Sequence, residues 1–200
     1  MISENLAKIL LALSIISNLT AYVIYIRLMV TERIKPHSIT FLVWAIILGI
    51  NFLVQVFSGV GLGSILIATN LLGCLIVFGF SYKKFGLAYD KLDWACFILA
   101  LVAIGLWVVS KTPLYSVILS CVIDFLALLP SFRKSFHKPN EDSSLTFFIS
   151  GLEYLFSLPS YLVFSFLVLA YPICVLTLDF SYAAFITIRR FQIKKLTITS

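Results

Sequence analysis

Apolar residues form seven long runs along the chain, separated by short polar or glycine-rich segments. A helix needs about 20 mostly apolar residues to cross the hydrocarbon core of a bilayer. Most of the runs are close to that length, although the sixth is shorter and the seventh is longer. The pattern therefore predicts an all-α fold with seven transmembrane helices, at 9–30, 38–57, 64–82, 92–110, 114–132, 144–158 and 161–188.

Basic residues are distributed unevenly over the segments between these runs. Thirteen of the fifteen Lys and Arg residues follow the first, third, fifth and seventh runs, whereas Lys8 and Lys111 lie on the other side. Basic residues in short loops stay on the cytoplasmic side of a membrane. Seven crossings place all thirteen on one face, so we expect the N-terminus outside and the C-terminus in the cytoplasm.

Composition supports a membrane location. The 200 residues are 61% hydrophobic and 12% charged, with a mean hydropathy of +1.07. A soluble domain is typically about 45–50% apolar and about 25% charged. We therefore expect a multi-pass protein of the inner or plasma membrane, with the lipid bilayer as a partner. The loops account for the net charge of +6, so nucleic acid is not an expected partner.

The polar segment after the first run recurs about a hundred residues later. Each copy leads through Ser-(Ile/Leu)-Thr-Phe into an apolar helix, with the Ser predicted as the N-cap. Helices one to three and five to seven then form two repeats joined by a single linker helix, which leaves both repeats in the same orientation. At a shift of 106 positions the coinciding pairs are Asn18 and Asp124, Arg27 and Arg133, Ser38 and Ser144, Thr40 and Thr146, and Phe41 and Phe147.

The predicted organisation is therefore three helices, one linker helix and three helices. The first bundle covers 1–84, and the linker helix with its flanking loops covers 85–112. The second bundle covers 113–190, and a basic cytoplasmic tail covers 191–200.

Two short motifs connect this plan with a known family. The segment from Lys35 to Trp44 reads Lys-Pro-x-x-x-Thr-x-x-x-Trp, and Asp124 precedes Pro130 by six positions. With the three-one-three plan, these motifs resemble the SWEET and PQ-loop superfamily, most closely its small bacterial SWEET-like members. The resemblance implies a carrier that works by alternating access. It also implies a binding role for Asn70, which matches an Asn in the third helix of the sugar-carrying members.

Three acidic residues lie deep inside apolar runs: Asp124, Glu153 and Asp179. An acid at the centre of a membrane helix costs about 2.5–3.5 kcal/mol on insertion scales. Such residues usually face the interior of a helix bundle or a water-filled cavity. They are candidates for substrate binding or proton coupling. The alternative is a structural role, in which a carboxyl group hydrogen-bonds a neighbouring helix.

Neutral polar residues and one tryptophan complete the predicted site. Side-chain amides both donate and accept hydrogen bonds, which suits a polar solute, and an indole ring can stack on a ligand. Pro172 is the candidate hinge, because a proline inside a helix frees backbone carbonyl groups. The predicted substrate-binding residues are Asn18, Trp44, Asn51, Gln55, Asn70, Asp124, Glu153 and Asp179.

We expect a transporter of a small polar solute, with proton coupling as one option and a homo-oligomer as another. The alternative is a non-transporting receptor or cargo-binding protein of the same fold. No catalytic set, metal site or cofactor is expected, so the chain is not predicted to be an enzyme. His37 and His137 fall in cytoplasmic segments and are expected to be exposed.

Overall fold

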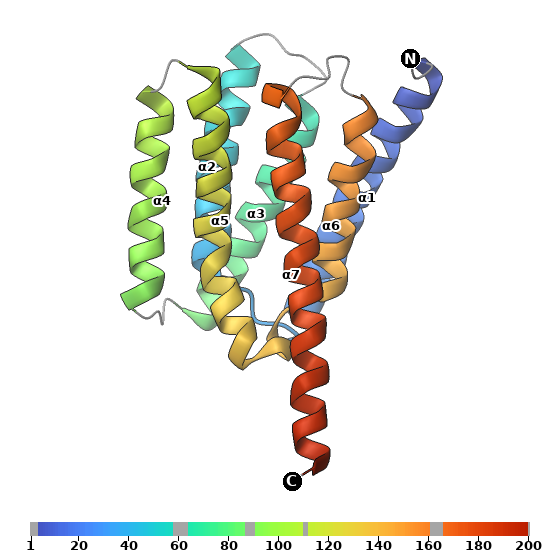
Figure 1. The fold of residues 1–200 in the computed structure, drawn as a ribbon, viewed down its shortest axis with the longest axis vertical. Helices are drawn as coiled ribbons and strands as arrows, with labels where there is room; N and C mark the ends of the chain where they lie inside the picture. The colour runs from blue at the N-terminus through green and yellow to red at the C-terminus, as the bar shows by residue number, and fades with distance from the viewer. Residues whose placement is uncertain (1–3, 58–63, 87–90, 110–111, 161–165, 200) are drawn as a thin grey trace. The chain divides into compact units, whose positions relative to one another are not determined.

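The computed structural model describes residues 4–57, 64–86, 91–109, 112–160 and 166–199 (Figure 1). Within these ranges the chain forms seven α-helices and two short 3-10 helices, and it contains no strand. The all-α prediction is therefore confirmed for the described part. The elements are α1 (Glu4–Val30), α2 (Ser38–Phe57), α3 (Ser64–Phe85), α4 (Lys91–Val109), α5 (Pro113–His137), η2 (Pro139–Glu141), α6 (Ser144–Ser157), η3 (Leu158–Ser160) and α7 (Phe166–Thr199).

Helices α5 and α7 extend furthest beyond the C-terminal ends that hydropathy predicted, and α1 and α3 also exceed their predicted limits. Helix α5 runs through Pro130 to His137, and α7 continues to Thr199, so the expected tail is helical over its described residues. The last turns of α7 project beyond the ends of α1 and α6 (Figure 1). Hydropathy marks where apolar residues stop, whereas a helix can continue through Arg and Lys, which are good helix formers.

Among the described residues, two helical stretches are long and apolar enough to cross a membrane by length and composition, Lys8–Val30 in α1 and Leu169–Lys195 in α7. Helices α2 and α4 contain shorter apolar stretches, Ser38–Leu53 and Asp93–Val109.

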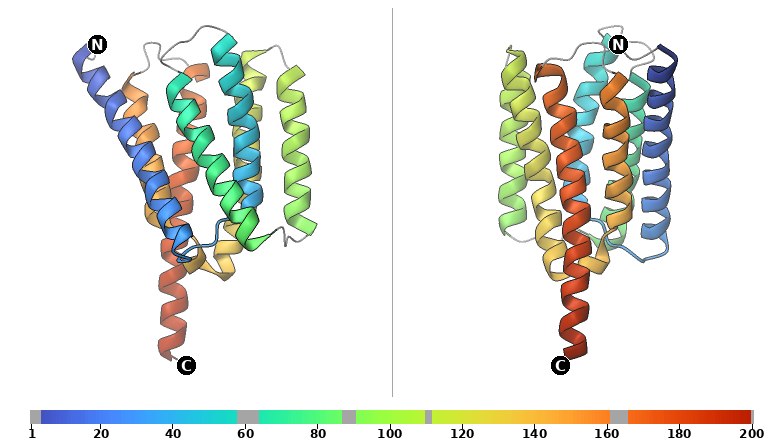
Figure 2. Two further views of the ribbon diagram at one scale, coloured as in Figure 1. Left: turned by 180° about the vertical axis from the view of Figure 1, so that it is seen from behind. Right: turned by 45° about the vertical axis from the view of Figure 1, so that its right-hand side comes forward.

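The chain divides into two compact units. The first combines Met1–Lys35 with Phe132–Ser200, and the second is Pro36–Ser131. In the first unit α6 packs against both α1 and α7 (Figure 2). In the second unit α2 packs against α3 and α4. These units follow spatial contacts and not the sequence repeat, so the division into two repeated bundles stays a prediction.

The second unit has an apolar core built on one face of α2. Its residues recur every four positions on α2, and alanines on α4 and α5 let the helices approach closely. The core residues are Ile39, Val43, Ile47, Ala100, Ala103, Ile104, Ile123 and Ala127.

The first unit buries a narrow and unusually polar face of α1. Ser14, Asn18 and Tyr25 are all at most 2% exposed, and they follow one another at helical spacing. Other faces of the same helix are open, since Val23 is 65% exposed. Ala21 and Met29 share the buried face, so the interior beside α1 combines apolar side chains with three buried polar ones.

The predicted N-caps are wrong at both copies of the Ser-(Ile/Leu)-Thr-Phe segment. Helix α6 is capped one residue earlier, by Ser143, whose Oγ accepts a hydrogen bond from the Thr146 N–H at 3.2 Å. Ser38 is the first residue of α2, and its Oγ lies 2.6 Å from the Ser81 Oγ. The Ser81 hydroxyl donates to the Pro36 carbonyl oxygen at 2.8 Å, so Ser38 is the donor to Ser81. The Ser38 hydroxyl therefore links the start of α2 to α3.

Candidate functional site

A buried hydrogen bond joins α1 to α6 in the first unit. The Asn18 Nδ2 donates to the Glu153 Oε2 at 2.9 Å, and the two side chains are 1% and 2% exposed. The residues are 135 positions apart in the chain. Two of the predicted site residues therefore meet directly, in a contact that links two helices which otherwise expose many apolar side chains.

A buried hydroxyl lies near this pair. Ser14 is fully buried one turn before Asn18 on the same face of α1, about 6 Å away along the helix axis. Its Oγ has no hydrogen-bond partner among the described residues. Buried polar atoms are normally satisfied by protein or by ordered water. The polar face of α1 therefore offers a hydroxyl for a water or for a solute beside the Asn18–Glu153 pair.

Helix α7 supplies the third predicted residue of the first unit. Asp179 is 4% exposed. Pro172 is also buried and lies seven residues earlier, about 10 Å along the axis, in a helix that continues through it. The described residues thus place the predicted hinge within two turns of a buried carboxyl group.

The second unit holds the other predicted residues. Asp124 is 5% exposed on α5, while Asn51 on α2 and Asn70 on α3 are half-buried. The Gln55 side chain lies outside the described residues. The Trp44 ring packs against the apolar core and meets the Phe41 ring edge-on, with centroids 5.4 Å apart.

Another buried carboxylate, in a loop segment, was not predicted from the sequence. Asp142 is 1% exposed and follows η2 in the segment between α5 and α6. Its Oδ1 accepts from the Tyr25 hydroxyl at 2.9 Å and from the Ser143 N–H at 2.8 Å, and its Oδ2 accepts from the Tyr182 hydroxyl at 2.8 Å. The Tyr182 oxygen in turn accepts from the Ser135 hydroxyl at 2.7 Å. We call these five residues the Asp142 network.

The network was missed because an acid among basic loop residues is usually solvated, and tyrosines near helix ends are usual at membrane interfaces. One sequence signal could have found it. Asp142 directly precedes Ser143 and Ser144 at the start of α6. At such a position a carboxylate can accept hydrogen bonds from backbone N–H groups.

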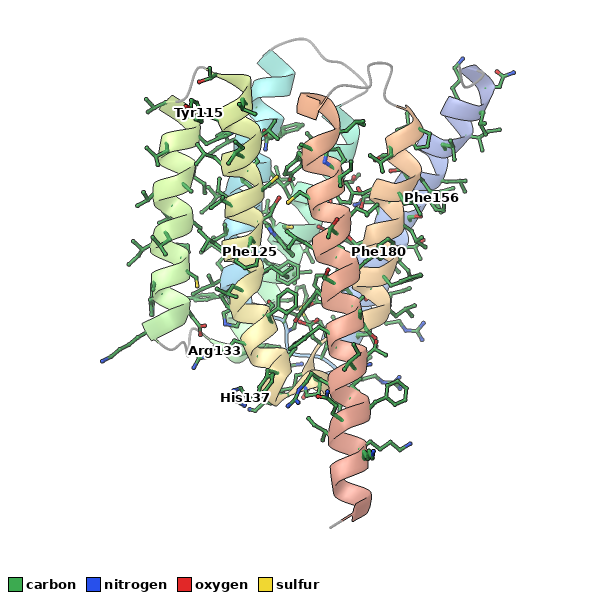
Figure 3. All side chains as sticks on the ribbon, in the orientation of Figure 1. Tyr115, Phe125, Arg133, His137, Phe156 and Phe180 are labelled. Carbon is green, nitrogen blue, oxygen red and sulfur yellow. The ribbon has the colours of Figure 1, made fainter. Side chains whose placement is uncertain are left out.

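Basic residues bind backbone carbonyls in the same region. The Arg190 guanidinium donates to the carbonyl oxygens of Pro139 and Asp142. The Arg189 guanidinium donates to the Phe136 carbonyl oxygen at 2.8 and 3.1 Å, and it lies 3.9 Å from the centroid of the Phe136 ring. These contacts hold the start of the α7 extension against the last turn of α5, where Figure 3 labels Arg133 and His137, and against the segment that follows it.

Lys134 lies in this region and is mostly buried. Its Nζ donates to the Glu141 carbonyl oxygen at 3.3 Å. Burial lowers the pKa of its ammonium group, which the nearby carboxylates of Asp142 and Glu141 partly oppose.

The prediction that both histidines are exposed is wrong for His37. It is 8% exposed, and its Nε2 lies 3.5 Å from the Asp93 Oδ2 in the first turn of α4. His137 is exposed, as predicted. The difference arises because the segment before α2 folds against α4 within the second unit, a tertiary contact that loop composition does not encode.

No protein-family model matches the chain, and neither a curated protein nor a solved structure shows significant similarity to it.

Proposed function

We propose that the chain is a multi-pass membrane carrier that moves a small polar solute by alternating access. In this proposal the chain crosses the membrane seven times, with the N-terminus outside and the C-terminus in the cytoplasm. Three features support a membrane location: the hydropathy of the chain, the two helical stretches long and apolar enough to span, and the thirteen basic residues on one predicted face. The resemblance of the Lys35–Trp44 and Asp124–Pro130 motifs to those of SWEET-like proteins supports a role as a carrier.

The observation that carries the proposal is the Asn18–Glu153 hydrogen bond. An acid within a membrane bundle is costly and usually serves a substrate or ion pathway. Here the acid is almost completely buried and faces an amide on another helix. A side-chain amide both donates and accepts hydrogen bonds, and a carboxyl group accepts them, so the pair combines the groups that recognise a polar solute.

Glu153 would supply the coupling chemistry of this site. As a carboxylate it accepts hydrogen bonds only, and as a protonated acid it also donates one. Proton uptake would therefore change which solute groups the pair can bind, and it would remove a charge that favours a cation. The Asn18–Glu153 pair with Ser14 suits a solute with hydroxyl or amine groups, and Pro172 would let α7 bend as the site opens.

The test is uptake into proteoliposomes from a panel of radiolabelled sugars, polyols, amino acids and amines. We expect the wild-type protein to accelerate entry of at least one solute over protein-free liposomes. Glu153→Gln keeps an oxygen that accepts the Asn18 amide proton but cannot ionise. We expect it to lower uptake about tenfold or more. The reason is that a solute group loses its hydrogen bond to a charged carboxylate, and such a bond contributes about 1.5–3 kcal/mol.

Glu32→Gln is the matched control, because Glu32 is exposed in the segment after α1. It should transport like the wild type, and both variants should keep the wild-type melting temperature. Equal uptake by Glu153→Gln and the wild type would remove the proposed role of Glu153. Tight binding of one solute from one side, without flux of any, would favour a receptor over a carrier.

A further inference from the structure

An open apolar groove runs between α6 and α7 in the first unit. It encloses about 560 Å³, and its walls include Leu145 and Phe148 of α6 and Phe180, Ala184 and Ile188 of α7. The large side chains at its edges are open, since Leu145 is 56% exposed and Ile188 is 55% exposed. Figure 3 labels Phe180 partway along α7. The described residues that line the groove include no carboxylate.

The polar atoms of the groove wall are few. Thr187 is one of its two polar wall residues, and its hydroxyl donates to the Ala183 carbonyl oxygen of the same helix at 2.9 Å. On α7 the groove spans nine residues from Phe180 to Ile188, about 12 Å along the axis. Half of a hydrocarbon core about 30 Å thick is about 15 Å. The groove therefore has the surface and the length to accept an acyl chain of one leaflet.

The side of α7 that lines the groove carries a basic residue further along the helix, beyond the end of the groove. Ala184, Ile188, Phe191 and Lys195 follow one another at spacings of four, three and four residues, which keeps them on one side of the helix. Phe191 is 70% exposed, and Lys194 and Lys195 are exposed as well. Lys195 lies seven residues past Ile188, about 10 Å along the axis.

The surroundings of these lysines are also basic. The segments 133–142 and 189–195 contain seven Lys and Arg residues but only two acids. One of the acids, Asp142, is buried in its network, and the other, Glu141, lies within 4.0 Å of the ammonium groups of three lysines. Seven basic residues against two acids leave these two segments with an excess of positive charge.

We propose that this groove and its lysines bind an anionic phospholipid of the cytoplasmic leaflet. The acyl chain lies between α6 and α7, Phe191 sits at the level of the headgroup boundary, and Lys194 and Lys195 contact the phosphate. The proposal rests on the membrane location and orientation proposed above, but not on transport. A basic residue near the membrane surface attracts anionic lipid by about 1 kcal/mol, so two lysines should give roughly tenfold or greater preference over a zwitterionic lipid.

The test is lipid binding to the purified full-length protein in detergent, measured by native mass spectrometry. The probes are dioleoyl phosphatidylglycerol and dioleoyl phosphatidylcholine. We expect the wild type to bind the anionic lipid at least tenfold more tightly. The double variant Lys194→Gln/Lys195→Gln should lose that preference while keeping weak binding of both lipids. Ala184→Trp, which fills the groove, should weaken binding of both.

The control is Lys83→Gln/Lys84→Gln, which removes two exposed lysines at the end of α3 in the other unit. It should bind like the wild type. Melting temperatures check folding, and the two lysine pairs lie on exposed surface, so their result stands even if Ala184→Trp does not fold.

Equal affinity of the wild type for the two lipids would overturn the proposal, as would equal losses in both lysine double variants. A dimer that Ala184→Trp dissociates would assign the groove to a second copy of the chain. Whether the protein is embedded in the membrane is tested separately. Extraction of the protein from membranes by alkaline carbonate would contradict the proposed membrane location.

Discussion

Gly151 sets how closely α6 approaches α7. A Cβ atom at this position would lie 2.6 Å from the Cε1 of Phe180, closer than real Cβ contacts. We therefore expect Gly151→Ala to lower the unfolding free energy by about 1–3 kcal/mol, the usual cost of overpacking. Denaturation of the purified protein in detergent measures this change.

Gly105→Ala is the matched control, because a Cβ there would meet nothing within 4 Å. Its stability should stay the same or rise slightly, since alanine favours a helix more than glycine does. Adding Phe180→Leu to Gly151→Ala should restore part of the loss. If Gly151→Ala is as stable as Gly105→Ala, then α6 and α7 are not in this close contact.

At the residue scale, the sequence predicted which acidic side chains are buried better than it predicted which residues contact each other. The sequence predicted that Asp124, Glu153 and Asp179 would face an interior, because an acid in an apolar run cannot face lipid cheaply, and all three are buried. It did not predict that Asn18 meets Glu153, because a contact between residues 135 positions apart depends on how helices pack. The burial of His37 was missed for the same reason.

At the scale of elements, the Asp142 network ties the segment between α5 and α6 to α1 and α7. Its carboxylate accepts three hydrogen bonds, and an amide has only one acceptor atom with which to replace them. We expect Asp142→Asn to lower the unfolding free energy by about 2 kcal/mol or more. It should also speed trypsin cleavage after Lys134, whose side chain is only 16% exposed in the intact network.

Glu141→Gln makes the same chemical change at the neighbouring residue. Glu141 forms only long ion pairs, at 3.5–4.0 Å, with lysines on a partly exposed surface. Such pairs contribute about 0–1 kcal/mol, so this variant should be nearly as stable as the wild type. Equal stability losses in the two variants would show that Asp142 acts as an ordinary surface charge.

Helix positions were largely predictable, and helix ends were less so. Helix α2 has the predicted limits, because it starts after Pro36 and an apolar run defines its length. Helices α5 and α7 extend further, because Arg and Lys continue a helix into the region where hydropathy falls. The extension of α7 matters for function, since it carries Phe191 and the two lysines of the proposed lipid site.

At the scale of the whole molecule, the positions of the loops test the proposed topology. Single cysteines in place of Lys35 and Lys138, in a variant without the native cysteines, should react with an impermeant maleimide from the cytoplasmic side. A cysteine in place of Lys111 should react from the outside. The reason is that basic residues of short loops stay in the cytoplasm. Reaction of the first two positions from opposite sides would contradict seven crossings.

The composition of the two compact units could not be predicted from the sequence. The repeat relates neighbouring helices to a second set of neighbouring helices, whereas the first unit combines α1 with α6 and α7. A sequence repeat records how segments correspond to each other, and it does not determine which helices share the most contacts. That grouping places the buried residues Asn18, Glu153 and Asp179 in the same unit.

The central claim is that the protein carries a solute by alternating access, and counterflow tests it most directly. Proteoliposomes are preloaded with an unlabelled solute and diluted into a trace of the same solute carrying a radiolabel. A carrier exchanges one for the other, so we predict that internal label rises transiently above its equilibrium level and then declines, and that Glu153→Gln shows little or no overshoot. Absence of any overshoot in the wild type, with a solute that the purified protein binds, would contradict the account.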